Sequence, residues 1–337
     1  MAFITINKAF LYNNLDYISE VVGGKDKICL VIKNNAYGHG IIEIASLIKS
    51  YGIKNVYVKN DTEAKVIENF CFDSVIVSSG KGIYQALNVS HVINDLSNIE
   101  NYPIGTIVEL NIDTGMHRDG INPTEIEKAI LIIKKRELFL KGVYTHFQSS
   151  DEDNDFIYKQ EEVFNTCVNK IKKLISYGFR VHCSNSHGIH KINNQNYDFA
   201  RIGIAAYGYF DLYPEKLTPI LSLYAEKKST KVLCKGDRIG YGSNGFIVDE
   251  DDFIVSNYDI GYGDGFLRLD ENNKYILLNG KQITGIVSMD SLSVACDSDT
   301  VLLFNDVRKL ARTHNTIVYE ILTSLKHYIP RYIIQHE

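Results

Sequence analysis

Short apolar runs alternate with helical patterns over the first two thirds of the chain, and this alternation constrains the fold more than any other feature. Strands that are separated by helices pair in parallel, because each crossover helix returns the chain to the same edge of the sheet. The clearest helix runs from about Asp155 to Tyr177, with Val163 and Ile171 on its apolar face and Gly178 as its stop signal. The candidate strands are Ile28–Ile32, Asn55–Val58, Ser74–Val77, His91–Asn94, Thr106–Ile112, Leu140–Thr145, Arg180–Cys183 and Phe199–Tyr207. Eight such strands predict an α/β fold with a (β/α)8 barrel, although weak helical patterns between the third, fourth and fifth strands leave a doubly wound sheet open.

The pattern changes after about Thr218. Short runs rich in Val and Ile are separated there by Gly, Asn and Asp turns, which predicts a mostly-β domain. We therefore expect the barrel over residues 1–218 and the β domain over residues 219–337. The alternation over Phe3–Ile6 is compatible with residues 1–8 pairing with this later sheet and not with the barrel.

The composition is that of an ordinary globular protein. The 337 residues are 45% hydrophobic and 23% charged, with a formal net charge of −5. This charge gives no basic surface for nucleic acid or anionic lipid, and no apolar run approaches the ~18 residues of a membrane span. The N-terminal Met1–Ile6 lacks a basic segment followed by a long apolar core, so no signal peptide is expected. Six cysteines without a CxxC pair suggest free thiols, and we expect a soluble, cytoplasmic protein.

Lys33 is the strongest candidate for chemistry, because it directly follows the apolar strand Ile28–Ile32. Partial burial lowers the pKa of an ammonium group and makes the amine available to attack a carbonyl. A lone lysine at this place would more often extend into solvent. The whole segment Val31-Ile-Lys-Asn-Asn-Ala-Tyr-Gly-His-Gly40, however, resembles the cofactor-lysine segment of the alanine racemase family. The resemblance implies pyridoxal 5'-phosphate as the cofactor, with Lys33 at the Schiff-base position and Tyr37 close by.

The ends of the last two predicted barrel strands carry a second set of candidates. Loops at these places often hold a phosphate, and a serine hydroxyl beside a glycine N–H is a plausible cradle for it. The racemase family has an Asn-Ser pair followed fifteen residues later by Arg-x-Gly-Ile, and Ser186 and Arg201 keep that spacing. By resemblance, the residues that hold the cofactor phosphate are Tyr37, Ser186, Gly203, Ile204 and Tyr319.

Arg201 is expected, by the same resemblance, to meet the pyridine nitrogen of the cofactor. A guanidinium group is always charged and can only donate hydrogen bonds, so the ring nitrogen must stay an unprotonated acceptor. This weakens the ring as an electron sink and favours return of a proton to Cα over transamination or decarboxylation.

Racemisation requires acid/base groups on both faces of Cα. Lys33 is one, and the segment Arg238-Ile-Gly-Tyr-Gly242 resembles the family segment that supplies the other, which places the second base at Tyr241. In the family this tyrosine comes from the partner subunit, so the resemblance implies a homodimer with shared active sites. His146 matches the family histidine that links this tyrosine to Arg201. A phenol with a pKa of about 10 needs such positive surroundings to act as a base.

Two further segments resemble family signatures near the substrate. They are Ile260-Gly-Tyr-Gly-Asp-Gly265 and Gly285-Ile-Val-Ser-Met-Asp290, with Gly263 in place of alanine and Ile286 in place of arginine. By resemblance, the backbone N–H of Met289 from the partner chain binds the substrate carboxylate. Tyr262 and Tyr319 line the entrance, with Asp151 and Arg268 behind them, and a tyrosine at 319 implies a small pocket that suits alanine.

Arg118, in Asp113-Thr-Gly-Met-His-Arg118, matches the family arginine that contacts the substrate carboxylate, a task for a planar fork of donors. Much of the family braces this arginine with a carbamylated lysine, and Asn111 occupies that position here. An amide oxygen can accept from Arg118 but cannot neutralise it, so we hypothesise that this protein needs no carbamate.

The expected function is interconversion of L-alanine and D-alanine, which in the family supplies D-alanine for cell-wall precursors. A broader racemase acting on serine or lysine, a decarboxylase on the same barrel and a non-catalytic pyridoxal-phosphate carrier are the alternatives. A carrier has no need of Tyr241, and a decarboxylase would place an acidic residue, not Arg201, against the ring nitrogen. No metal is expected, because His182, His187 and His190 lack a frame of carboxylate or thiolate ligands.

Overall fold

The computed structural model describes residues 1–210, 215–242, 246–268, 275–277 and 279–335. The chain divides into two compact units. The barrel unit comprises Leu11–Ala36 and Ile44–Thr218, and the sheet unit comprises Met1–Phe10, Tyr37–Glu43 and Pro219–Glu337. No helix among the described residues is long and apolar enough to cross a membrane.

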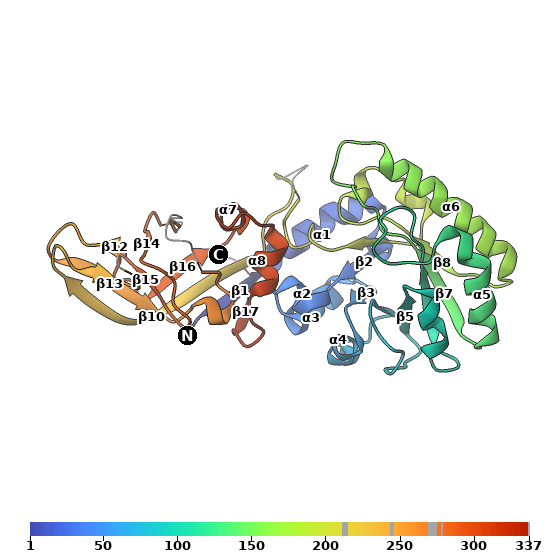
Figure 1. Ribbon diagram of the computed structural model, residues 1–337, viewed down its shortest axis with the longest axis horizontal. Helices are drawn as coiled ribbons and strands as arrows, with labels where there is room; N and C mark the ends of the chain where they lie inside the picture. Colours follow the sequence, from blue (N-terminus) through green and yellow to red (C-terminus); the bar gives the residue numbers. More distant parts are fainter. Residues whose placement is uncertain (211–214, 243–245, 269–274, 278, 336–337) are drawn as a thin grey trace. The chain divides into compact units, whose positions relative to one another are not determined.

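The barrel unit contains eight parallel strands, which confirms the predicted parallel barrel (Figure 1). They are β2 (Ile28–Val31), β3 (Asn55–Val58), β4 (Ser74–Val77), β5 (Val89–Ile93), β6 (Ile107–Asn111), β7 (Phe139–Tyr144), β8 (Arg180–His182) and β9 (Ala200–Ile202), in the spatial order β8-β7-β6-β5-β4-β3-β2-β9. Backbone hydrogen bonds from Asp198 N to Val181 O and from Arg201 N to Ser184 O, both 2.9 Å, nearly close the ring between β8 and β9. The eighth strand was predicted over Phe199–Tyr207, but β9 is much shorter, because the chain turns into a loop after Ile202.

The helices around these strands are α1 (Lys8–Val22), α3 (Ile41–Tyr51), α4 (Asp61–Val66), α5 (Ile126–Lys135) and α6 (Phe156–Leu174). The described chain between β4 and β5 has no α-helix, and only the 3-10 helix η3 (Leu96–Asn101) lies between β5 and β6. The weak helical pattern noted at these places in the sequence therefore reflects real loops. Between β8 and β9 the chain likewise forms only η5 (Gly188–His190) and η6 (Asn194–Asn196).

Helices α5 and α6 pack on the outside of the barrel strands and bury one continuous apolar cluster with them (Figure 1). Phe164, Ile171 and Val168 are on the inner face of α6. The assignment of Val163 to that face was wrong, since its side chain is 38% exposed. Helix α6 also ends at Leu174, one turn before the expected stop at Gly178, because Ile175 takes an extended conformation.

The sheet unit is built on a seven-stranded sheet in the order β14-β15-β13-β10-β1-β17, with β16 also paired to β10. Its strands are β1 (Phe3–Asn7), β10 (Leu221–Leu233), β13 (Phe253–Tyr258), β14 (Ile283–Thr284), β15 (Leu292–Val294), β16 (Thr300–Phe304) and β17 (Arg331–Ile334), and a separate pair is formed by β11 (Arg238–Ile239) and β12 (Phe246–Ile247). Strand β1 runs antiparallel to β10 and parallel to β17. The first residues of the chain therefore belong to this sheet. Two short helices, α7 (Arg308–Thr313) and α8 (Val318–Ser324), and the 3-10 turn η7 (Tyr262–Asp264) complete the unit.

Candidate active site

Parallel pairing places the carboxyl ends of all eight barrel strands at one mouth of the barrel, where active sites of such folds are built. Lys33 and His146 each lie two residues after the last residue of a strand, β2 and β7, and Arg201 lies within β9. Burial lowers the pKa of His146 to about 3, and the positive charges of Arg201, Arg118 and Lys33 contribute to the shift. Burial likewise lowers the pKa of Lys33, with further contributions from Arg118 and Arg201. At the mouth, three positively charged groups thus act on one neutral imidazole, which suits a site for an anionic ligand.

The chain reverses directly after Lys33 in an unusual turn. Asn34, Asn35, Ala36 and Tyr37 all have left-handed backbone conformations, with φ between 52° and 55°. Such a conformation costs roughly 1–2 kcal/mol for each residue with a side chain, so the surroundings must hold it in place. Backbone N–H groups of the turn donate to Ile32 O at 2.9 Å and to the Glu63 carboxylate at 3.1 Å. Sequence reasoning placed a loop here but could not give its handedness.

The loops after β8 and β9 meet at Ser186. Its hydroxyl oxygen accepts from the backbone N–H groups of Gly203 at 3.0 Å and Ala205 at 3.4 Å, and Ser186 and Ile204 are both buried. The Asn185 side chain shapes the loop by accepting from His187 N and Gly188 N. The structure therefore brings together three of the five residues assigned to the phosphate.

The other two residues assigned to the phosphate belong to the sheet unit. Tyr37 and Tyr319 lie side by side there, with ring centroids 5.9 Å apart. Tyr319 is at the start of α8 and is 36% exposed, whereas Tyr37 is buried.

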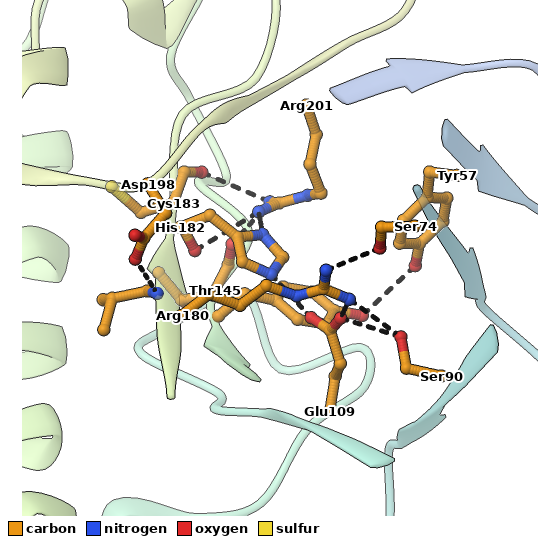
Figure 2. Close-up of polar contacts among 12 residues, drawn as sticks. Tyr57, Ser74, Ser90, Glu109, Thr145, Arg180, His182, Cys183, Asp198 and Arg201 are labelled. Carbon is orange, nitrogen blue, oxygen red and sulfur yellow. Dashed lines mark hydrogen bonds and ion pairs between the residues drawn. The ribbon is translucent and has the colours of Figure 1, made fainter. Parts of the chain in front are cut away.

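Arg201 is buried and almost fully committed to hydrogen bonds (Figure 2). Its Nη2 donates to the carbonyls of Thr145 at 2.6 Å and Cys183 at 3.2 Å. Its Nη1 donates to His182 Nδ1 at 2.8 Å and to the His182 carbonyl at 3.3 Å. Among hydrogen bonds within the described chain none uses Nε, which remains available to a ligand. The histidine bonded to Arg201 is therefore His182, and no such bond joins Arg201 to His146 in the described residues.

Three residues lie behind Arg201 that sequence reasoning did not assign to this place: Glu109 and Arg180 were not singled out, and His182 was considered only as a metal ligand. His182 Nε2 lies 2.7 Å from Glu109 Oε2, and Glu109 Oε1 bonds Arg180 Nη2. Burial by itself raises the pKa of the Glu109 carboxyl, but Arg180 and His182 together lower it to about 2. A glutamate inside the apolar run Ile107–Leu110 was the available signal, since a buried carboxylate requires partners.

Arg118 and Asn111 do not contact each other through a hydrogen bond in the described residues. Arg118 is exposed, and its Nε lies 3.3 Å from Asp119 Oδ2. Asn111 is buried at the end of β6, where its Nδ2 donates to Asn94 Oδ1 at 2.9 Å, and its own Oδ1 has no partner within the described chain. Asp151 lies exposed in the loop after β7. Within the described chain, no group of three or more His, Cys, Asp or Glu side chains could hold a metal.

The remaining candidates lie in the sheet unit and are exposed. Tyr241 is 62%, Met289 55% and Tyr262 42% exposed, and Arg268 is exposed as well. Backbone approach brings their segments together: a Cβ on Gly285 would lie 2.7 Å from Ile239 O, and one on Gly261 would lie 2.2 Å from Met289 O. Tyr262 N also donates to Ser288 O at 3.1 Å. The stretch from Gly285 to Asp290 therefore contacts both tyrosine segments. The side chains of Tyr241, Tyr262 and Met289 in these segments are exposed.

Comparisons with known proteins match the whole chain. The sequence model of the family "Alanine racemase, N-terminal domain" matches residues 6–211, and that of "Alanine racemase, C-terminal domain" matches residues 220–333. Curated relatives named alanine racemase come from Nitratiruptor sp., 39% identical over 98% of this chain and 99% of that protein, and from Campylobacter concisus, 38% identical over 99% and 100%.

Solved structures agree with this match. An alanine racemase from Bacillus anthracis with bound L-Ala-P is 26% identical, covers 99% of this chain and 95% of its own, and superposes with a TM-score of 0.87. An alanine racemase from Bartonella henselae with covalently bound pyridoxal phosphate has the same fold, with a TM-score of 0.79 at 24% identity and coverage of 99% of each chain. The full-length match to relatives well above 30% identity establishes that the chain belongs to the alanine racemase family.

Proposed function

We propose that this protein interconverts L-alanine and D-alanine with pyridoxal 5'-phosphate as its cofactor. The observation that carries the proposal is at the barrel mouth, where the positive charges of Arg201, Arg118 and Lys33 all act on His146. Membership of the alanine racemase family supports the same activity.

The residues present fit the cofactor. Arg201 keeps Nε after its two terminal nitrogens are used, so it can donate one hydrogen bond to the pyridine nitrogen. The Ser186 oxygen accepts from the N–H of Gly203, which leaves the Ser186 hydroxyl hydrogen able to donate to a phosphate oxygen. When bound, pyridoxal phosphate withdraws electrons from an attached amino acid and so makes its Cα–H acidic.

Two bases on opposite faces of Cα complete the proposed reaction. Lys33, whose pKa is lowered mainly by burial, takes or returns the proton on one face. Tyr241 of the partner subunit does so on the other face. The exposure of Tyr241 in its own chain, 62%, is what a residue given to a neighbouring subunit requires. We therefore propose a homodimer with shared active sites.

For the substrate, we propose that Arg118 and the backbone N–H of Met289 of the partner subunit bind the carboxylate, because both donate hydrogen bonds. Tyr262, Tyr319, Asp151 and Arg268 are proposed to line the entrance. The bulk of Tyr319 favours the methyl side chain of alanine over longer side chains.

We also propose a functional division near residue 218, with the cofactor lysine in the first part and the second base in the other. The described cysteines are all free, which agrees with a cytoplasmic location and a role in supplying D-alanine for cell-wall precursors.

The proposal is tested by incubating the cofactor-loaded protein with L-alanine in deuterium oxide and reading chirality and Cα deuterium together. D-alanine that carries deuterium is expected. In Tyr241→Phe, the L-to-D reaction should be lost while cofactor binding persists. A cofactor spectrum without exchange on alanine, serine or lysine would refute the racemase, and exchange on serine or lysine alone would overturn the substrate.

A further inference from the structure

A chain of buried polar groups runs through the interior of the barrel behind Arg201 (Figure 2). It links Arg201 on β9 to His182 on β8, then to Glu109 on β6 and back to Arg180 on β8. His182 and Glu109 are fully buried, so water cannot substitute for any partner that is lost. Each donor in this network of buried polar groups must therefore face an acceptor.

The protonation of His182 follows from this requirement. Arg201 Nη1 can only donate, so His182 Nδ1, 2.8 Å away, must be the acceptor. The proton of the neutral ring then lies on Nε2 and is donated to Glu109 Oε2 at 2.7 Å. The ring is also held from its faces, by Tyr144 with a centroid distance of 5.1 Å and by Phe199 at 4.4 Å.

Arg180, at the other end of this network, is held by hydrogen bonds to two further barrel strands. Arg180 donates to Ser74 Oγ on β4 at 2.5 Å and to Ser90 Oγ on β5 at 2.9 Å. The Ser90 hydroxyl in turn donates to Glu109 Oε1 at 2.9 Å. Both carboxylate oxygens of Glu109 therefore face donors: Arg180 and Ser90 at one, His182 at the other.

We propose that Glu109 is a positioning residue that fixes the tautomer of His182 and thereby holds Arg201 in the orientation that presents Nε to the cofactor. The role rests on the proposed function, since it concerns the contact between Arg201 and the pyridine nitrogen. Arg180 is the counter-ion that allows Glu109 to remain charged in the barrel interior. The low pKa of the Glu109 carboxyl, about 2, agrees with this assignment.

Glu109→Gln separates this role from simple packing, because glutamine has nearly the same shape but only one acceptor. If its oxygen faces His182, its amide N–H groups face the donors of Arg180. If its oxygen faces Arg180, its N–H groups face His182 Nε2, and the ring must move its proton to Nδ1, against Arg201 Nη1. The single variant therefore contains a donor–donor clash in either orientation.

The double variant Glu109→Gln/Arg180→Met removes that clash. The amide can then donate to Ser90 Oγ while its oxygen accepts from His182 Nε2. We expect cofactor affinity and kcat to fall about 10- to 100-fold in Glu109→Gln and to recover in the double variant, with little change in KM for alanine. A merely structural role would make the double variant the worse of the two.

The tautomer is read directly by 15N NMR of His182 in the histidine-labelled, cofactor-loaded full chain, with the signal assigned by a His182→Gln variant. The wild type should show a protonated Nε2 and an unprotonated Nδ1. The opposite tautomer in the wild type would overturn the proposal even if Glu109→Gln fails to fold, as would a double variant that is no better than the single one.

The NMR measurement also distinguishes the positioning role of Glu109 from the proposed racemase activity. A wild type that does not racemise alanine but has the expected tautomer would refute the proposed function and leave the positioning of Arg201 intact.

Discussion

Gly142 on β7 is the position where one added carbon should disturb the barrel interior most clearly. A Cβ built there would lie 2.7 Å from Arg180 Cγ and 2.7 Å from Glu109 Oε2, where ordinary contacts begin at 3.4 Å. Overpacking of a core costs about 1–3 kcal/mol, and separating a buried ion pair costs about 3–5 kcal/mol. Because the added methyl touches both members of the pair, we expect Gly142→Ala to lower the free energy of unfolding by about 2–4 kcal/mol.

Urea unfolding of the cofactor-free protein, followed by far-UV circular dichroism, measures this loss. Gly178→Ala is the matched control, because it adds the same carbon to the same unit with no atom within 4 Å. Its free energy of unfolding should stay within about 1 kcal/mol of the wild type. Equal stability of the two variants would refute the view that Gly142 makes room for the pair of Glu109 and Arg180.

Three further outcomes follow from the structure. Ser186→Ala removes the acceptor of two backbone N–H groups, so cofactor affinity measured by absorbance titration should fall about 10-fold; unchanged affinity would exclude Ser186 from the cradle. Burial lowers the pKa of His182 to about 4, so between pH 6.5 and 4 the unfolded chain binds more protons than the folded one. Lowering the pH through this range should therefore reduce the free energy of unfolding, by up to about 1.4 kcal/mol per pH unit from this residue. Urea midpoints that do not change between pH 7 and 5 would contradict a neutral buried His182. Phe164→Ala should cost about 3–5 kcal/mol, whereas Val163→Ala, one residue earlier and 38% exposed, should change the urea midpoint little; similar losses would contradict the register of α6.

The sequence alone was sufficient for parallel strands separated by helices and for the place of Lys33, while the barrel and the doubly wound sheet both stayed open on the pattern alone. A strand such as Ser74–Val77 is a local apolar run bounded by turn residues, so its existence and ends are encoded within a few neighbouring positions. Local patterns were less reliable for deciding which face of a helix is buried. Val163 and Phe164 are adjacent apolar residues on α6, and only packing against the barrel decides which one is buried.

The partners of Arg201 were decided by tertiary structure. Arg180 and Glu109 are 71 positions apart, and Arg180 and Ser74 are 106 apart, yet closure of the barrel places all three side chains in one interior. The sequence pattern of a single strand does not predict which charged residues will pair across the barrel. The sequence thus determined where the barrel strands lie, apart from the length of the last one, and which segments carry chemistry. Only the folded barrel decided that His182 holds Arg201, because a buried donor must find its acceptor in space and not along the chain.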